Sequence, residues 1–262
     1  MATSISTHRD AARLLWGLTG AAWLVLLALR LVPHGHLAHP AHAVAGVAAG
    51  VAWPLVIAAF AGGWLVMVAA MMLPTTVPMA RMFTVVSAGH HAPAPARAAF
   101  YMAYIALWLA FAAVAFASAV GLQLLTGDAP HGLILAGALA LAGAFQFSPL
   151  KQRCLTACRE PAAFLFAHYR RGVAGAWSVG LRHAGSCLGC CWALMLVMFA
   201  TGTADLAWML GLTAVMVAEK TTRWGPRLVA PVGIALLAIA AVLAVGDLAT
   251  LGTAERVHDH VH

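Results

Sequence analysis

The chain has 262 residues, of which 63% are hydrophobic and only 9% are charged. A soluble domain is typically about 25% charged, so this composition excludes an ordinary soluble protein and predicts an integral membrane protein. The formal net charge is +7, but no segment has the clustered basic residues with interleaved aromatic ones that nucleic-acid binding would need. We therefore expect the lipid bilayer as a partner and no nucleic acid.

About seven apolar runs are long enough to consider as membrane spans, because roughly 20 apolar residues cross a bilayer. They are residues 13–32, 53–73, 98–121, 131–147, 185–202, 205–219 and 227–248. None shows the alternation of a membrane β-strand, so the predicted fold class is all-α, a polytopic transmembrane helix bundle. No convincing signal-peptide cleavage site follows the first run, which we interpret as a retained helix.

These runs divide the chain into three parts. Residues 1–52 hold the first membrane helix and an external loop with His34, His36, His39 and His42. Residues 53–248 form the remaining helix bundle, and residues 249–262 form a tail with His258, His260 and His262. Histidine-rich tracts can bind Zn or Cu(II), although polar tails of this kind also occur without a function.

The basic residues predict the orientation of the bundle. All of the 15 except Arg30 and Arg256 fall in segments that share one side of a seven-span bundle. By the positive-inside rule, the N-terminus is then cytoplasmic and the C-terminus is outside. All five cysteines lie on the cytoplasmic side, where thiols are normally kept reduced, so we do not expect a disulfide framework.

The most informative segment is 183–198, where three of the five cysteines lie within five residues at the start of an apolar run. In a helix, His183, Cys187, Cys191 and Met195 would share one face because each is four residues from the next. Cys190 is three residues after Cys187 and directly before Cys191, so it would lie next to this helix face. Imidazole and sulfur ligands of this kind suit Cu(I), zinc or an iron–sulfur centre.

Three further segments bring candidate ligands to the inner face. The run 53–73 ends with Met71, and Pro74 and Pro78 are expected to terminate or kink the helix there. Cys154 and Cys158 follow the fourth run at helical spacing, among basic residues that favour thiolates. Glu219 ends the sixth run, where a carboxylate needs a partner such as Lys220, Arg223 or a basic residue of the large inner loop.

The large inner loop itself carries a stretch, 164–180, that we interpret as one interfacial helix with aromatic and basic anchors. His168 in it is expected at the surface rather than at a metal. The complete set of candidate metal ligands is Cys154, Cys158, Cys187, Cys190, Cys191, His183, Met195, Met71 and Glu219. We find no catalytic constellation, and we expect a binding protein rather than an enzyme.

Four motifs together resemble a bacterial family of predicted metal-binding integral membrane proteins. They are M-M-L-P at 71–74, P-L-K-x2-C-x3-C-R at 149–159, C-x-G-C-C-W at 187–192, and Glu219-Lys220. The resemblance covers roughly residues 53–245, and the doubled-cysteine motif is its most specific part. It implies a multi-pass protein of the bacterial inner (plasma) membrane with a metal site, and it implies no particular activity.

The ligand chemistry favours copper, because thiolates and thioethers select soft metals and copper binds most tightly wherever it is available. We therefore expect a protein that handles or delivers Cu(I), with zinc or an iron–sulfur centre as the alternative cofactor. Its partner would be a membrane metalloenzyme or a metal chaperone. Two alternatives remain: a membrane thiol oxidoreductase that uses the C-x-x-C of Cys187 and Cys190 or the pair Cys154 and Cys158, and a non-catalytic accessory or assembly subunit of a membrane complex.

Overall fold

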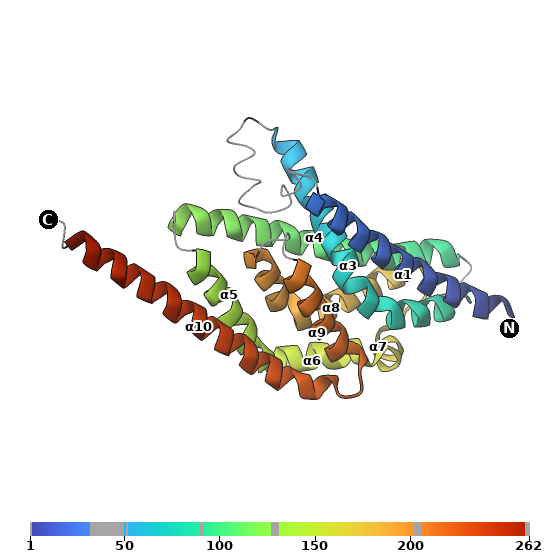
Figure 1. The fold of residues 1–262 in the computed structure, drawn as a ribbon. Coiled ribbons are helices and arrows are strands. Elements are labelled where there is room, and N and C mark those ends of the chain that lie inside the picture. The colour runs from blue at the N-terminus through green and yellow to red at the C-terminus, as the bar shows by residue number, and fades with distance from the viewer. Residues whose placement is uncertain are drawn as a thin grey trace.

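The protein was analysed as a computed structural model that describes residues 2–31, 50, 52–89, 92–126, 131–201 and 206–259 (Figure 1). Within these ranges it consists of nine α-helices and no strand, which confirms the all-helical prediction. The helices are α1 (Ala2–Leu31), α3 (Trp53–Ser87), α4 (Pro93–Thr126), α5 (His131–Gln146), α6 (Pro149–Arg159), α7 (Pro161–His168), α8 (Val173–Thr201), α9 (Leu206–Thr221) and α10 (Gly225–Asp259).

Within the part of the chain that the structure describes, five helical stretches are long and apolar enough to cross a membrane. They are Asp10–Leu29, Trp53–Ser87, Pro93–Ser118, Val173–Met198 and Gly225–Asp247. A sixth candidate is the pair Gly132–Gln146 and Pro149–Arg159, which is bent by 69° at its break. The expected count of about seven spans is therefore not confirmed within the described residues, where α9 has only 16 residues and about 20 are needed to span a bilayer.

The break between α5 and α6 follows from local sequence. Residues before a proline avoid the helical region, so Ser148 adopts an extended conformation (φ −68°, ψ 136°) ahead of Pro149. The Ser148 hydroxyl then accepts a hydrogen bond from the Leu150 amide at 3.1 Å and caps α6. The bend lays α6, which carries Cys154 and Cys158, against α8 and α9.

Neither proline of α3 ends the helix, so of the two expected outcomes, termination or a kink, the structure excludes termination. The helix continues through Pro74 and Pro78 to Ser87. Pro74 cannot donate the usual hydrogen bond to the Ala70 carbonyl, and the Trp23 indole of α1 donates to it instead, at 3.2 Å. The contact with α1 thus replaces the missing backbone hydrogen bond.

The stretch 164–180 is not one interfacial helix, which corrects that prediction. Helix α7 ends at His168, and α8 begins at Val173, immediately after Gly172. Gly172 has a φ of +89°, a conformation that residues with a side chain rarely adopt. The chain therefore turns here, and Trp177 belongs to the long α8.

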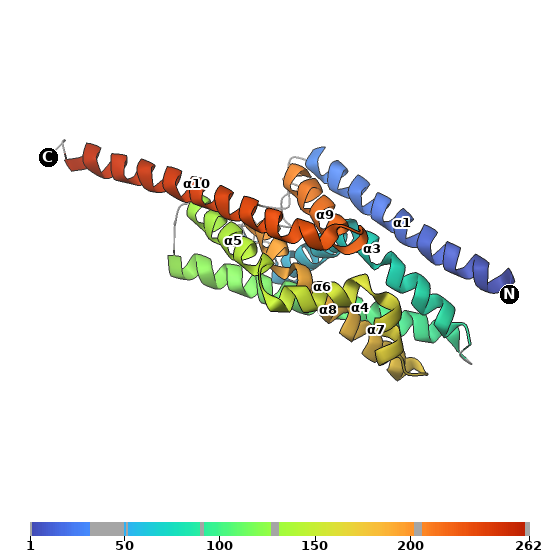
Figure 2. The same cartoon turned by 90° about the horizontal axis from the view of Figure 1, so that it is seen from below.

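The described helices pack around α8. Helix α8 contacts α4, α5, α6 and α9, while α1 packs along α3 and α10 along α5. Figures 1 and 2 show α8 inside the bundle and α1 and α10 on its outside, with α9 between these two outer helices. The largest buried cluster contains residues of α3, α6, α8 and α9, including Met72, Cys187, Cys190 and Cys191.

The histidine-rich segments lie mostly outside the described residues. This holds for His34, His36, His39, His42, His260 and His262. Helix α10 continues to Asp259, past the boundary at 248 that we expected between bundle and tail.

Candidate metal centre

Helix α8 holds three buried thiols side by side. Cys187, Cys190 and Cys191 are each at most 2% exposed. The Sγ atoms of Cys190 and Cys191 lie 3.0 and 2.9 Å from the Cys187 carbonyl oxygen, one helical turn earlier. The helical spacing predicted from the sequence therefore does gather these thiols on one part of α8.

Helix α3 adds a thioether to these thiols. The Sδ atom of Met72 lies 3.7 Å from the Sγ of Cys191 and 4.0 Å from the Sγ of Cys187. The sequence analysis named its neighbour Met71, which is also fully buried. Consecutive helical residues point about 100° apart, so the rotation of α3 in the bundle decides which of the two methionines reaches α8.

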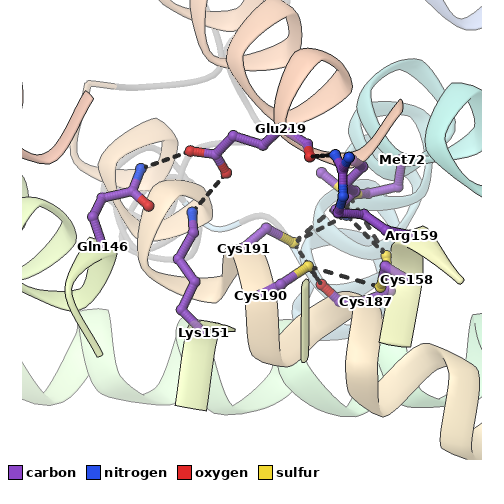
Figure 3. A network of polar contacts seen from close by, with 10 residues as sticks. Met72, Gln146, Lys151, Cys158, Arg159, Cys187, Cys190, Cys191 and Glu219 are labelled. Carbon is purple, nitrogen blue, oxygen red and sulfur yellow. Dashed lines mark hydrogen bonds and ion pairs between the residues drawn. The ribbon is translucent and has the colours of Figure 1, made fainter. Parts of the chain in front are cut away.

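Helix α6 adds the remaining two cysteines. The Sγ of Cys158 lies 3.9 Å from the Sγ of Cys190 (Figure 3). Cys154 lies beside Gly189: a Cβ atom at that glycine would be 2.6 Å from the Cys154 Sγ. The absence of a side chain at Gly189 thus allows α6 to approach α8 closely. All five cysteines are free thiols.

We call Met72, Cys158, Cys187, Cys190 and Cys191 the sulfur centre. Three of its sulfur–sulfur separations, Cys158–Cys190, Cys187–Met72 and Cys191–Met72, run from 3.7 to 4.0 Å. Metal–sulfur bonds of about 2.3 Å put two sulfurs roughly 3.8 Å apart in a tetrahedral site and about 4.0 Å apart in a trigonal one. The donor set is soft, and the members of each of these three pairs are as far apart as two ligands of one soft metal ion would be.

A cation lies where three of these sulfurs converge. The Lys220 Nζ is 3.3 Å from the Sγ of Cys187, 3.7 Å from the Sδ of Met72 and 3.9 Å from the Sγ of Cys191. The Tyr104 hydroxyl lies 3.3 Å from the Cys187 Sγ on another side. In the described part of the chain, no three His, Cys, Asp or Glu side chains form a ready-made metal site, and the Lys220 ammonium stands among the sulfurs instead.

Glu219 faces away from the sulfur centre. Its Oε2 accepts from the Lys151 Nζ at 2.7 Å, and its Oε1 accepts from the Gln146 Nε2 at 3.2 Å (Figure 3). The Arg159 guanidinium donates to the Glu219 backbone carbonyl. Lys151 and Glu219 are both almost fully buried. The expectation that a basic residue of the inner loop pairs with Glu219 is therefore confirmed, and that residue is Lys151.

His183 is buried on the same helix as the thiols, and neither of its ring nitrogens has a hydrogen-bond partner among the described residues. Its ring stacks on Phe100 and Tyr104 and meets Phe164 edge-on. Buried polar atoms normally have partners, so an unpartnered imidazole one turn before Cys187 is unusual. Met195, also predicted as a ligand, is fully buried in the largest apolar cluster, which also contains the three thiols of α8.

Sequence reasoning missed Met72 and Lys220 as neighbours of the thiols. Both stand next to a residue that it did name, Met71 and Glu219. The signal for Lys220 was present: an ammonium at the end of an apolar span needs a partner as much as a carboxylate does. Lys151 contacts Glu219 from 68 positions away in the sequence, and Tyr104 contacts Cys187 from 83 positions away. No local sequence pattern predicts these particular pairs.

Comparisons with known proteins place these residues in context. The sequence matches the model of the family described as "PpoB2: Copper chaperone" over residues 61–243, a range that includes every residue of the sulfur centre. Neither a curated protein nor a solved structure matches the chain.

Proposed function

We propose that this chain, which belongs to the PpoB2 copper chaperone family, binds Cu(I) as its cargo in the sulfur centre and delivers it to a partner protein. That the protein handles copper follows from its family. The residues that bind the copper ion, and its oxidation state as Cu(I), are part of the proposal. The observation that supports it best is the meeting of Met72 from α3 and Cys158 from α6 with the three thiols of α8. Thiolates and thioethers are the ligands that select Cu(I).

The exposure of the cysteines supports loading from the side of α6. Cys154 is half-buried, Cys158 is 9% exposed, and Cys190 and Cys187 are at most 2% exposed. Cu(I) binding at Cys154 would pass inward by exchanging one thiolate ligand for the next, first at Cys158 and Cys190 and then at Cys187. His183 provides a further nitrogen ligand one turn away.

The membrane context is part of the same proposal. Five helices are long and apolar enough for a multi-pass protein, and the basic residues of α6 and of the connections beside it favour a cytoplasmic location for this side. We place the chain in the bacterial inner membrane, where it takes Cu(I) from a cytoplasmic donor and passes it to a membrane metalloenzyme.

Copper content of the purified protein tests the proposal. Reduced protein is loaded with Cu(I) under anaerobic conditions, separated from free metal, and analysed for copper per chain. We expect stoichiometric copper in the wild type and its loss in the Cys187→Ser/Cys190→Ser/Cys191→Ser variant. Met198→Leu is the control, because Met198 is fully buried on the same helix but is not part of the sulfur centre. Undiminished copper in the triple variant would refute the proposed ligands.

A thiol oxidoreductase is the second candidate, and one contact favours it. Cys158 and Cys190 approach to 3.9 Å between their Sγ atoms, and a disulfide requires about 2.05 Å. Oxidation would form that S–S bond and release two electrons and two protons to an acceptor such as a quinone. Protein that binds no copper but reduces a quinone through these two thiols would favour this function. Protein that does neither would favour the accessory role.

A further inference from the structure

Two buried lysines near the sulfur centre differ in how their charge is balanced. Lys151 pairs with the Glu219 carboxylate at 2.7 Å. Lys220, which is 6% exposed, contacts three sulfur atoms, and no salt bridge joins it to a carboxylate among the described residues. Lys220 is next to Glu219 in sequence, but Lys151 and Gln146 hold the carboxylate on the other side (Figure 3).

A buried ammonium is costly unless an anion compensates its charge. The groups that contact the Lys220 Nζ and can carry a negative charge are the thiols of Cys187 and Cys191. The positive charge of Lys220 is therefore balanced by thiolate sulfur. The net charge of the buried site is the sum of the charges of the sulfur centre, the bound ion and Lys220.

This count depends on the charge of the bound ion. A monovalent ion held by the two thiolates that contact Lys220, those of Cys187 and Cys191, has one net negative charge as long as Cys158 and Cys190 stay neutral thiols, and the Lys220 ammonium brings the buried site to neutrality. A divalent ion held by the same two thiolates is already neutral, so Lys220 leaves one uncompensated positive charge beside it. Such a charge is strongly unfavourable in an apolar interior.

We propose that Lys220 is a specificity-determining residue that selects monovalent over divalent soft ions at the sulfur centre. The inference rests on the proposed function, because it assumes that these thiolates bind the cargo ion. Lys220 itself is not a ligand. Its fixed positive charge disfavours Zn(II), which thiolates alone would bind tightly, and leaves Cu(I) as the preferred ion.

Cu(I) and Zn(II) provide a clean test, because both have a filled d shell and differ by one unit of charge. The dissociation constants of both ions are measured by chelator competition on the reduced, purified protein. The variants are Lys220→Gln and Lys220→Leu, which remove the charge, and Lys220→Arg, which keeps it. Methionine is avoided at this position because its thioether would add a ligand.

In both neutral variants we expect the ratio of affinities to shift toward zinc by roughly thirty- to a thousandfold. This range follows from Coulomb's law for two unit charges about 4 Å apart at effective dielectric constants between about 40 and 20. Lys220→Arg should shift the ratio by less than about tenfold. An unchanged ratio in Lys220→Gln and Lys220→Leu would overturn the role of Lys220 and leave the copper site intact.

A measurement on the wild type keeps the proposal testable if the neutral variants do not fold. Ag(I) and Cd(II) are another soft pair with equal electron counts and different charge. Wild-type protein should retain Ag(I) when challenged with equimolar Cd(II), and displacement of Ag(I) by Cd(II) would contradict the proposal. Wild-type protein that binds neither Cu(I) nor Ag(I) through its cysteines would instead overturn the proposed function.

Discussion

The Sγ atoms of Cys158 and Cys190 lie 3.9 Å apart although 32 positions separate the two residues. The bend after α5 makes this contact possible, because it lays α6 against α8. A thiol of one helix thereby meets the thiols of another, and neither helix alone holds the whole sulfur centre.

Met72 should contribute to copper binding and Met71 should not. Both residues are fully buried, but it is Met72 that contacts Cys187 and Cys191. Met72→Leu removes a soft ligand while conserving volume, and we expect it to weaken Cu(I) binding by about tenfold or more, which is about 1.4 kcal/mol. Met71→Leu is the matched control. Chelator competition measures both, and equal effects of the two substitutions would contradict the contact.

Gly189→Ala should destabilise the protein. The new Cβ would lie 2.6 Å from the Cys154 Sγ, and overpacking of this kind typically costs about 1–3 kcal/mol. Gly185→Ala on the same helix is the control, since nothing lies within 4 Å of its added Cβ. Thermal unfolding in detergent compares the two, and a melting temperature of Gly189→Ala at or above that of Gly185→Ala would argue against the close approach of α6.

The Lys151–Glu219 ion pair should show strong coupling in a double-mutant cycle. Removing one partner leaves a buried charge alone, so we expect Lys151→Met or Glu219→Leu each to lower the free energy of unfolding by about 3–5 kcal/mol. The double variant should recover most of that loss, because two apolar side chains of similar size need no partner. Additive losses in the double variant would indicate that the two charges do not depend on each other.

His183→Phe should separate stability from copper binding. Both ring nitrogens of His183 are buried and have no hydrogen-bond partner in the part of the chain that the structure describes, and the ring stacks on aromatic neighbours. Phenylalanine keeps the stacking and removes the unpartnered nitrogens, so we expect a gain of about 1–3 kcal/mol in unfolding free energy. If His183 is a copper ligand, the same variant binds Cu(I) more weakly. A stabilised variant with unchanged copper affinity would limit His183 to packing.

The sequence alone predicted the helical membrane class and the chemistry of the site. The spacing of Cys187 and Cys191 decides that they share a helix face, because helix geometry is local and depends only on residue separation. The soft donor set indicated copper for the same reason: it depends on residue types and needs no tertiary contact. The sequence predicted that a basic residue would pair with Glu219, but it did not identify Lys151 as that residue.

Tertiary structure decided the rest. The rotation of α3 selects Met72 over Met71, and the Trp23 contact lets that helix continue past Pro74. The bend after α5 brings Lys151 to Glu219 and Cys158 to Cys190. The orientation of α9 directs the buried Glu219 toward Lys151 and directs Lys220 toward the sulfur atoms. Helix rotation, bending and long-range pairing depend on how whole helices pack, whereas residue spacing within one helix is fixed by the backbone. The sequence therefore indicated the candidate cysteine ligands, and only the packing of the helices brought their side chains together.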